Sequence, residues 1–457
     1  MLRERVAGLV ALVMLATTDA ARGEEAPLPL AENSISFDGV KLHGAVDIGF
    51  QYQTHGAPIS PYFQGGSSEI VERYSNHSVF GVTPNNLGQS RVGLQGDFPV
   101  ISDWSVGFKL ETFFNPQSGE LSNGLKSLAQ NNGKALNEQT TNLDTSVAGQ
   151  VFQQSYVELS SSTFGKLRVG RQNSLLADAV ALYDPNQASQ AFSLIGLSGV
   201  TAGGGDTEDR RVDDSVKYVL TYAQRYHLAA LYKFSDGTQG GTTLTEGTAG
   251  MDVGDGAINA YVARTRDGIS ASPLSASQVA LLPSMGLSIN NSLAATVSDN
   301  LAYALMGAYR VQGATVSSGY ERIQFSDPSN PLAPGYDDIG DYRIAFINNA
   351  AYPHDRILSV YWLGAKYPLT TAWSVTAAYY GYHQNSYGDG ANAGCYSNVS
   401  STCSGRLGAA SLSTEWNITK HVDCYAGLVY SQVHNGLAYE YLHTTNMNPT
   451  IGVHVAF

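Results

Sequence analysis

The sequence has few charged residues and lacks long apolar runs. Only 14% of its 457 residues are charged, whereas an ordinary soluble domain has about 25%. Hydrophobic residues make up 43%, yet no stretch after the amino terminus approaches the roughly 20 continuous apolar residues of a membrane-spanning helix. Low charge without apolar runs is typical of a β-barrel whose strands face lipid on one side and water on the other.

The sequence also lacks the motifs of common enzymes. It contains no His-Glu-x-x-His, no Gly-x-Ser-x-Gly and no phosphate-binding loop, so we expect neither enzymatic activity nor a cofactor. Residues 1–23 hold three of the 26 basic and two of the 39 acidic residues, which leaves 23 against 37 in the rest of the chain. This acidity argues against nucleic-acid binding and mildly favours a lumen that attracts cations.

Cysteine is rare, with three residues in the chain. Cys395 and Cys403 lie in a polar loop at 387–405, and an oxidising compartment would join them in a disulfide. A metal pair is the alternative, but Asp389 is the one further ligand that the loop offers. We expect no metal site. Cys424 belongs to a strand and is predicted to be a free, lipid-facing thiol.

The amino terminus has the layout of a secretory signal peptide. Residues 1–5 are basic, residues 6–16 are almost wholly apolar, and small residues follow. We predict a signal peptide over 1–23, with the cleavage position open, and a single barrel domain over 24–457. An exported chain without a spanning helix crosses a membrane only as a closed barrel, because lipid offers no partners for backbone polar groups.

The last strand alternates strictly. One face carries four apolar side chains and the other carries Gly452 and His454. A soluble sandwich could also end this way, but a strand that closes on an aromatic residue resembles the signature that outer-membrane barrels present to their assembly machinery. The four apolar residues are Ile451, Val453, Val455 and Phe457.

Chain length and connection lengths predict about sixteen strands. About 434 residues remain after the predicted signal peptide, or roughly 27 for each of about 16 strands with its loops. Short turns alternate with long segments rich in Gly, Ser, Asn and Asp, as in barrels whose short turns are periplasmic. The predicted strands are 40–54, 87–98, 103–115, 150–160, 164–171, 212–223, 226–235, 243–253, 256–265, 287–297, 301–325, 356–369, 373–386, 406–417, 421–434 and 449–457. The predicted short turns are 98–103, 160–163, 223–226, 254–255, 298–300, 370–372 and 419–420.

The two faces of each predicted strand differ in polarity. Ile48 and Phe50 alternate with Asp47 and Gln51, and similar alternation recurs in later strands. In a soluble barrel the charged face would be outside. The predicted export signal and the terminal aromatic residue favour the inverse arrangement, with charges lining a wet lumen.

Six phrases and the terminal strand resemble the Gram-negative general porins, which are sixteen-stranded trimeric barrels. The resemblance extends over nearly the whole chain after the signal peptide. The phrases lie at 42–49, 90–96, 155–159, 164–172, 214–218 and 419–427, in the order and spacing of that family.

The resemblance implies a porin in the outer membrane of a Gram-negative bacterium. Such a protein is a water-filled channel for the passive diffusion of small hydrophilic solutes and ions. It also implies a homotrimer in the lipid bilayer that meets the barrel-assembly machinery through the strand ending at Phe457. A substrate-selective channel or an adhesin-like surface barrel is the alternative.

The resemblance further implies a constriction loop at 172–211 that folds into the barrel. In that family an acidic loop segment, here 178–185, faces basic side chains on the wall. Arg91 stands at the wall-arginine position, although Gln153 replaces an arginine that the family often has. The expected constriction residues are Arg91, Arg168, Arg171, Arg211, Asp178, Asp184 and Asp47.

Overall fold

The computed structural model describes most of the chain after residue 34. The described residues are 35–57, 59–62, 71–75, 77–122, 124–139, 151–197, 211–235, 242–336 and 342–457. The predicted signal peptide at 1–23 lies outside these residues.

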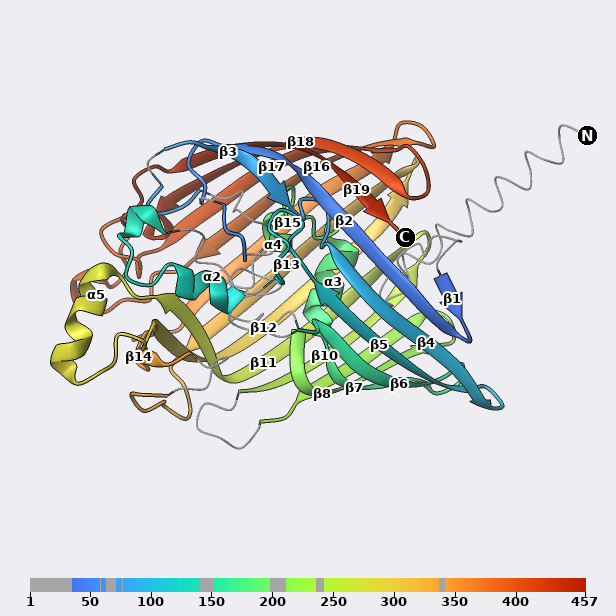
Figure 1. Ribbon diagram of the computed structural model, residues 1–457, viewed down its shortest axis with the longest axis horizontal. Helices are drawn as coiled ribbons and strands as arrows, with labels where there is room; N and C mark the ends of the chain where they lie inside the picture. Colours follow the sequence, from blue (N-terminus) through green and yellow to red (C-terminus); the bar gives the residue numbers. More distant parts are fainter. Residues whose placement is uncertain are drawn as a thin grey trace, which may run out of the picture.

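Sixteen of the nineteen strands in the described residues form one closed antiparallel barrel (Figure 1). The barrel closes because the last strand pairs with the first long one, from Ala456 opposite Ala45 to Thr450 opposite Gln51. The prediction of a sixteen-stranded antiparallel barrel is confirmed. The barrel strands are β2 (Val40–Gln53), β4 (Arg91–Ile101), β5 (Trp104–Phe113), β6 (Gln154–Ser161), β7 (Gly165–Asn173), β8 (Arg211–Tyr222), β9 (Tyr226–Lys233), β10 (Thr243–Val253), β11 (Gly256–Pro273), β12 (Leu293–Val311), β13 (Ala314–Ser326), β15 (Arg356–Pro368), β16 (Trp373–Gln384), β17 (Gly405–Asn417), β18 (Val422–Asn435) and β19 (Thr445–Ala456).

Three short strands lie beside the barrel strands. β1 (Ile35–Phe37) and β3 (Val79–Pro84) pair with the two ends of β2, and β14 (Ile344–Asn348) pairs in parallel with the start of β12. The tight turns all lie at one end of the barrel, which we call the short-turn rim. The long connections lie at the other end, the long-loop rim (Figure 1).

One predicted turn is wrong. The polar triplet at 298–300 suggested a break, but it lies inside β12, and the turn to β13 is at Gln312 and Gly313 instead. Both turn residues have positive φ, 49° and 84°, as a two-residue hairpin turn requires. The triplet stays extended because its polar groups find partners, for example the Asp299 carboxylate, which accepts the backbone N–H of Asp267 at 2.8 Å.

Outward and inward side chains differ in exposure, as the alternation of polar and apolar residues predicts. On β2, Phe50 is 52% exposed, whereas the inward His43 and Gln51 are buried. Rows of exposed Leu, Val, Ile and Tyr cover the outside of the other strands, which suits a surface in contact with lipid. No helix in the described residues is long and apolar enough to span a membrane.

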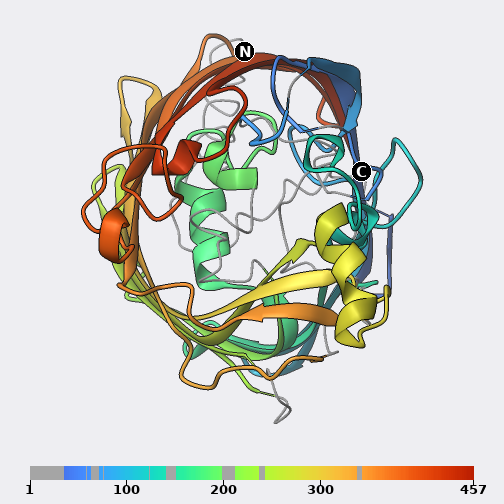
Figure 2. The same cartoon turned by 90° about the vertical axis from the view of Figure 1, so that its left-hand side faces the viewer.

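The helices are short, and two of them lie inside the barrel. Figure 2 looks along the barrel and shows the green helices α3 and α4 within the ring of strands. The helices are α2 (Gly124–Gln130), α3 (Leu175–Tyr183), α4 (Leu194–Leu197) and α5 (Ala276–Leu281), with 3₁₀ turns η2 (Leu136–Glu138), η3 (Leu282–Met285), η4 (Gly390–Asn392) and η5 (Gly436–Ala438).

The main hydrophobic core lies within the barrel, between α3 and the wall. The inward faces of β9–β13 and β15–β18 carry mostly apolar side chains, and we call this surface the apolar wall. The inward faces of β19, β2 and β4–β8 carry mostly polar and charged side chains, and we call this surface the polar wall. Helix α3 packs on the apolar wall and leaves the polar wall across the lumen (Figure 2).

Candidate functional site: the constriction inside the barrel

Polar contacts fix the start of α3. The Ser174 side chain accepts the backbone N–H of Ala177 at 3.1 Å, which caps the helix. The buried Glu246 carboxyl group on β10 accepts the backbone N–H of Leu175 at 2.5 Å, so an acidic side chain lies at the positive end of the helix. Because these contacts come from β10 as well as from the loop, they orient α3 relative to the wall.

Apolar packing holds the body of the loop. Leu176 and Val180 of α3, together with Phe192 and Ile195, are each at most 1% exposed and belong to the core on the apolar wall. Phe192 packs directly on Gly427 of β18. A Cβ at position 427 would lie only 2.5 Å from the phenyl ring, so a glycine is needed there. A fully buried side chain of this kind contributes about 1.5–3 kcal/mol.

Asp178, expected to face Arg91 and Arg168 across the pore, pairs with a lysine on β8 at the edge of the polar wall. Its carboxylate accepts a hydrogen bond at 2.7 Å from the Lys217 ammonium on β8. Lys217 is 1% exposed and Asp178 19% exposed at the side chain. The pair is therefore an anchor for α3 and contributes no net charge to the lumen.

Asp184, the other loop acid expected at the constriction, is fully buried. Its carboxylate accepts hydrogen bonds from the Tyr380 hydroxyl at 2.7 Å and from the Ala188 backbone N–H at 2.7 Å. Burial raises the pKa of the Asp184 carboxyl above its ordinary value, and the hydrogen bond from Tyr380 opposes this shift. The structure therefore places Asp184 between the loop and β16, where it is buried.

Asp47 has a similar place on the opposite wall. It is fully buried and accepts the Tyr425 hydroxyl at 2.5 Å and the backbone N–H groups of Leu87 and Gly88 at 2.7 and 2.8 Å. These contacts fold the segment before β4 inward. The carbonyl of Asn86 in that segment accepts a hydrogen bond at 2.8 Å from the backbone N–H of Ala191 in the constriction loop. Asp47 therefore stabilises the segment on which the constriction loop rests, and its carboxylate is not exposed to the lumen.

The basic side chains of the polar wall surround one carboxylate. Glu111 on β5 lies 2.9 Å from the His43 imidazole, 3.8 Å from the Arg91 guanidinium and 3.5 Å from the Lys109 ammonium. Strand register puts Arg91 and Glu111 on the inward face. Lys109 and Glu111 were not among the residues predicted for the site, although the alternation that indicated Arg91 also indicates them.

Two further expected arginines lie on the same wall. Arg168 on β7 forms an ion pair with Glu158 on β6 and lies over the Tyr156 ring, 5.0 Å from its centroid. Arg211 at the start of β8 lies 4.4 Å from the centroid of Phe113, a cation–π arrangement. The structure thus brings Arg91, Arg168 and Arg211 to one wall.

Arg171 does not join this group. It lies opposite Ser155 in the register of β6 and β7, beside the irregularity at Gly170. Its guanidinium pairs with Asp213. It comes three positions after the inward-facing Arg168, an odd number, so the alternation that brings Arg168 into the lumen does not extend to Arg171.

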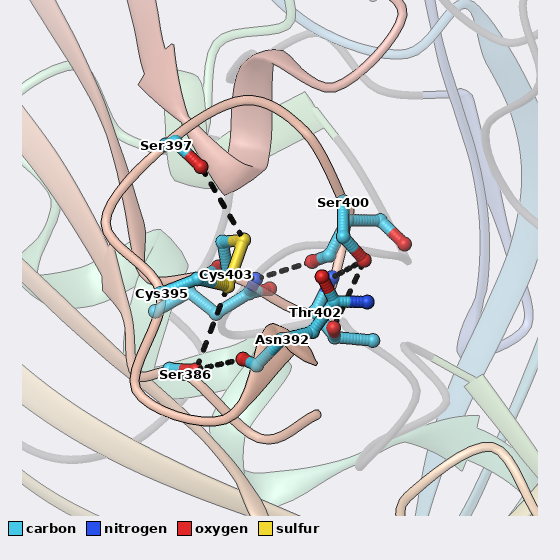
Figure 3. Close-up of a disulfide and its surroundings, with 9 residues drawn as sticks. Ser386, Asn392, Cys395, Ser397, Ser400, Thr402 and Cys403 are labelled. Carbon is cyan, nitrogen blue, oxygen red and sulfur yellow. Dashed lines mark hydrogen bonds between the residues drawn. A yellow bond between two sulfur atoms is a disulfide. The ribbon is translucent and has the colours of Figure 1, made fainter. Parts of the chain in front are cut away.

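The polar loop after β16 carries a disulfide. Cys395 and Cys403 are joined, with their Cα atoms 4.9 Å apart, while Cys424 is a free thiol (Figure 3). Serines surround the bridge, and the Ser386 hydroxyl donates a hydrogen bond at 3.2 Å to the Asn392 carbonyl. Within the described residues no group of three or more His, Cys, Asp or Glu side chains is placed to hold a metal ion.

A lumen narrowed by an inward loop is the arrangement of a diffusion channel, and a family comparison agrees. The family model described as "Gram-negative porin" matches residues 8–436. The chain belongs to the Gram-negative porin family. It is therefore a porin of the outer membrane, and it forms a channel for passive diffusion.

Solved porin structures share the fold. The anion-selective porin from Comamonas acidovorans is 16% identical, with 92% of this chain and 99% of that chain covered and a TM-score of 0.59. OmpT of Vibrio cholerae is 15% identical, with 93% and 100% covered and a TM-score of 0.55. Salmonella typhi OmpF, solved with daunomycin, is 12% identical, with 93% and 100% covered and a TM-score of 0.51. No curated protein sequence matches the chain.

Proposed function

We propose that the narrowest part of the porin lies between α3 and the polar wall, and that small hydrophilic solutes and ions diffuse through it without chemical change. The observation that carries this proposal is the position of α3 inside the barrel, where its apolar side chains pack on the apolar wall (Figure 2). Solutes must pass the remaining gap, which Arg91, Lys109 and Arg168 line from the other side.

Deleting residues 186–206 tests the proposal. The deletion removes Phe192 and the chain that returns from α3 to the wall, so single-channel conductance in planar bilayers should rise and larger polyethylene glycols should enter. A matched deletion of 276–285, which covers α5 and η3 (Ala276–Met285) at the long-loop rim, should leave both quantities close to wild type. Equal conductance for wild type and the 186–206 deletion would contradict the proposed constriction.

The porin is further proposed to be a homotrimer. Support comes from a solved trimer form of OmpT from Vibrio cholerae, which is 14% identical with a TM-score of 0.54. The mass of the purified protein in detergent should correspond to three chains before heating and to one chain afterwards. A single-chain mass in the unheated sample would contradict the proposal.

The strand ending at Phe457 is proposed to meet the barrel-assembly machinery. The Phe457 backbone exchanges two hydrogen bonds of 2.9 Å with Gly44, and its ring lies where a Cβ on Gly44 would clash at 2.4 Å. Deleting Phe457 should lower the amount of heat-modifiable barrel in isolated outer membranes, while Phe457→Tyr should retain it. A normal amount of barrel without Phe457 would contradict this role.

A further inference from the structure

We propose that a row of mostly basic side chains on the outside of the barrel binds the phosphate groups of lipids in the outer leaflet of the membrane. The row crosses β13 and β15–β18, which are neighbours in the barrel wall (Figure 1). Each member lies directly opposite the next in the strand register. We call it the basic row, and its members are Arg322, Ser359, His383, Arg406 and His434.

The basic row faces away from the lumen, as the exposure of its neighbours in the chain shows. His383 is exposed between Tyr382 and Gln384, which are both buried. Arg322 is partly exposed and follows Glu321, which is fully buried and points into the barrel. Successive side chains of a strand point to opposite faces, so the basic row belongs to the surface that meets lipid and not to the polar wall.

The basic row lies one membrane thickness away from an aromatic pair at the short-turn rim. Trp373 of β16 and Trp416 of β17 are opposite each other, with their ring centroids 5.2 Å apart. His383 and Arg406 are opposite each other on the same two strands, ten positions closer to the long-loop rim.

Ten residues of about 3.3 Å each, on strands tilted by roughly 40°, rise ~25 Å. This is the height of the apolar band of an outer-membrane barrel, and the outward residues between the two pairs are uncharged. Tryptophans mark one boundary of the hydrocarbon layer, so the basic row lies at the other. Because the short turns of such barrels are periplasmic, that boundary belongs to the outer leaflet.

The guanidinium groups of the basic row have no carboxylate bound to them. Within the part of the chain that the structure describes, neither Arg322 nor Arg406 forms an ion pair. Arg322 donates a hydrogen bond to the Gln324 side-chain oxygen at 3.2 Å. The Gln324 amide in turn donates to the Asp355 carboxylate at 2.8 Å, so Gln324 separates this acid from the arginine.

The middle of the basic row brings like groups together. Arg406 lies between His383 and His434 in the register of β16, β17 and β18. Basic side chains directly opposite one another repel when they are charged. A bound anion would remove this repulsion, and the planar guanidinium of arginine binds phosphate oxygens through paired hydrogen bonds.

Two tyrosine hydroxyls lie on the membrane side of the basic row. Gly381 and Gly408 are opposite each other, one outward position from His383 toward the short-turn rim. A Cβ on Gly381 would lie 2.6 Å from the Tyr361 hydroxyl oxygen, and one on Gly408 would lie 2.8 Å from that of Tyr379. The hydroxyls therefore add hydrogen-bond donors beside the basic side chains, above an apolar surface that accepts acyl chains. This combination fits a lipid phosphate better than a free anion.

Native mass spectrometry of the purified porin, offered equal amounts of phosphatidic acid and phosphatidylcholine, tests the proposal. The wild type should retain phosphatidic acid in preference. Arg406→Gln should weaken this retention about fivefold, because one basic side chain at a membrane surface contributes ~1 kcal/mol, and Arg322→Gln/Arg406→Gln should weaken it further. Ser359→Glu places a carboxylate inside the basic row and should also weaken it, which keeps the test decisive if the arginine variants do not fold.

Arg225→Gln is the matched control. It removes one exposed positive charge from the turn between β8 and β9 at the short-turn rim, and its retention of phosphatidic acid should equal that of wild type. Equal retention by wild type and the variants of the basic row would overturn the proposal. Displacement of phosphatidic acid by inorganic phosphate would show a site for free anions and would overturn the choice of a lipid. A smaller unheated mass of the double variant, with unchanged lipid retention, would show a contact between copies of the chain instead.

Discussion

The two walls of the lumen use the same strand geometry for opposite purposes. On the apolar wall, Tyr380 and Trp362 are at most 3% exposed and hold the loop, and the Trp362 indole N–H donates to the Tyr183 carbonyl at 2.9 Å. On the polar wall, Arg91 and Lys109 keep part of their surface in water. One wall therefore holds the loop and the other exposes charged side chains, so variants of the two walls should affect different measurements.

The largest effect is expected from a charge introduced under the loop. Phe192→Asp places a carboxylate in a fully buried apolar site, at a cost of several kcal/mol. We expect the loop to leave the wall and the conductance to rise severalfold, with the barrel still heat-modifiable in gels. Phe192→Leu is the control and should keep wild-type conductance. If the Asp variant conducts like wild type, the apolar wall does not hold the loop.

The Lys217–Asp178 pair should show an unequal response to the loss of either partner. Asp178→Asn leaves an ammonium that is 1% exposed without its carboxylate, whereas Lys217→Met leaves a carboxylate that is 19% exposed and accessible to water. Removing one partner of a buried pair costs about 3–5 kcal/mol, so Asp178→Asn should destabilise the seated loop more. The rate at which a protease digests the loop in the purified porin would show which variant destabilises it more. Equal digestion rates would contradict it.

The two buried tyrosine–aspartate contacts should weaken the loop by smaller amounts. Tyr380→Phe and Tyr425→Phe each remove a hydroxyl donor from a buried carboxylate, Asp184 or Asp47, at about 1–3 kcal/mol each. Conductance noise from loop movement should increase in both variants, and the double variant should show the sum of the two effects. Because neither tyrosine contacts Arg91, Lys109 or Glu111, and neither substitution changes a charged side chain, reversal potentials should stay at the wild-type value. A changed potential would mean that these acids do contribute to the field.

The smallest effect is expected from the disulfide. Cys395→Ser/Cys403→Ser opens a link between residues eight apart, which stabilises its own loop by about 2–3 kcal/mol. Barrel unfolding temperature and conductance should not change, while the loop should become more susceptible to protease. A lower unfolding temperature of the barrel would show that this loop supports the rim.

The barrel could be predicted from the sequence because the pattern that produces it lies within each strand. Each strand meets lipid on one side, so alternation at period two marks both the strand and its inward residues, including Arg91 and Arg168. The misplaced turn at 298–300 shows the limit of this reasoning. Polar residues such as Asp299 end a strand only if no neighbour satisfies them, and that neighbour is known only from the fold.

The roles of the acids could not be predicted in the same way. Alternation gives the direction of a side chain but not what covers it, and Asp47 and Asp184 are covered by the inward segments themselves. One feature of the sequence did indicate where the loop packs. In 301–308 both faces of the strand are apolar, with Ala302, Ala304 and Met306 pointing inward. An apolar inward face in a barrel filled with water indicates where a loop must pack.

The seam between β19 and β2 determines when the barrel can be completed. The Gln51 and Thr450 side chains are hydrogen-bonded at 3.3 Å across 399 positions of sequence. Contacts of such long range form slowly, because a very long loop of chain must close before they yield any stability. Until then, the edges of both strands are unpaired and can pair with other chains. Closure of this seam is therefore the folding step at which misassembly competes most strongly with the native barrel.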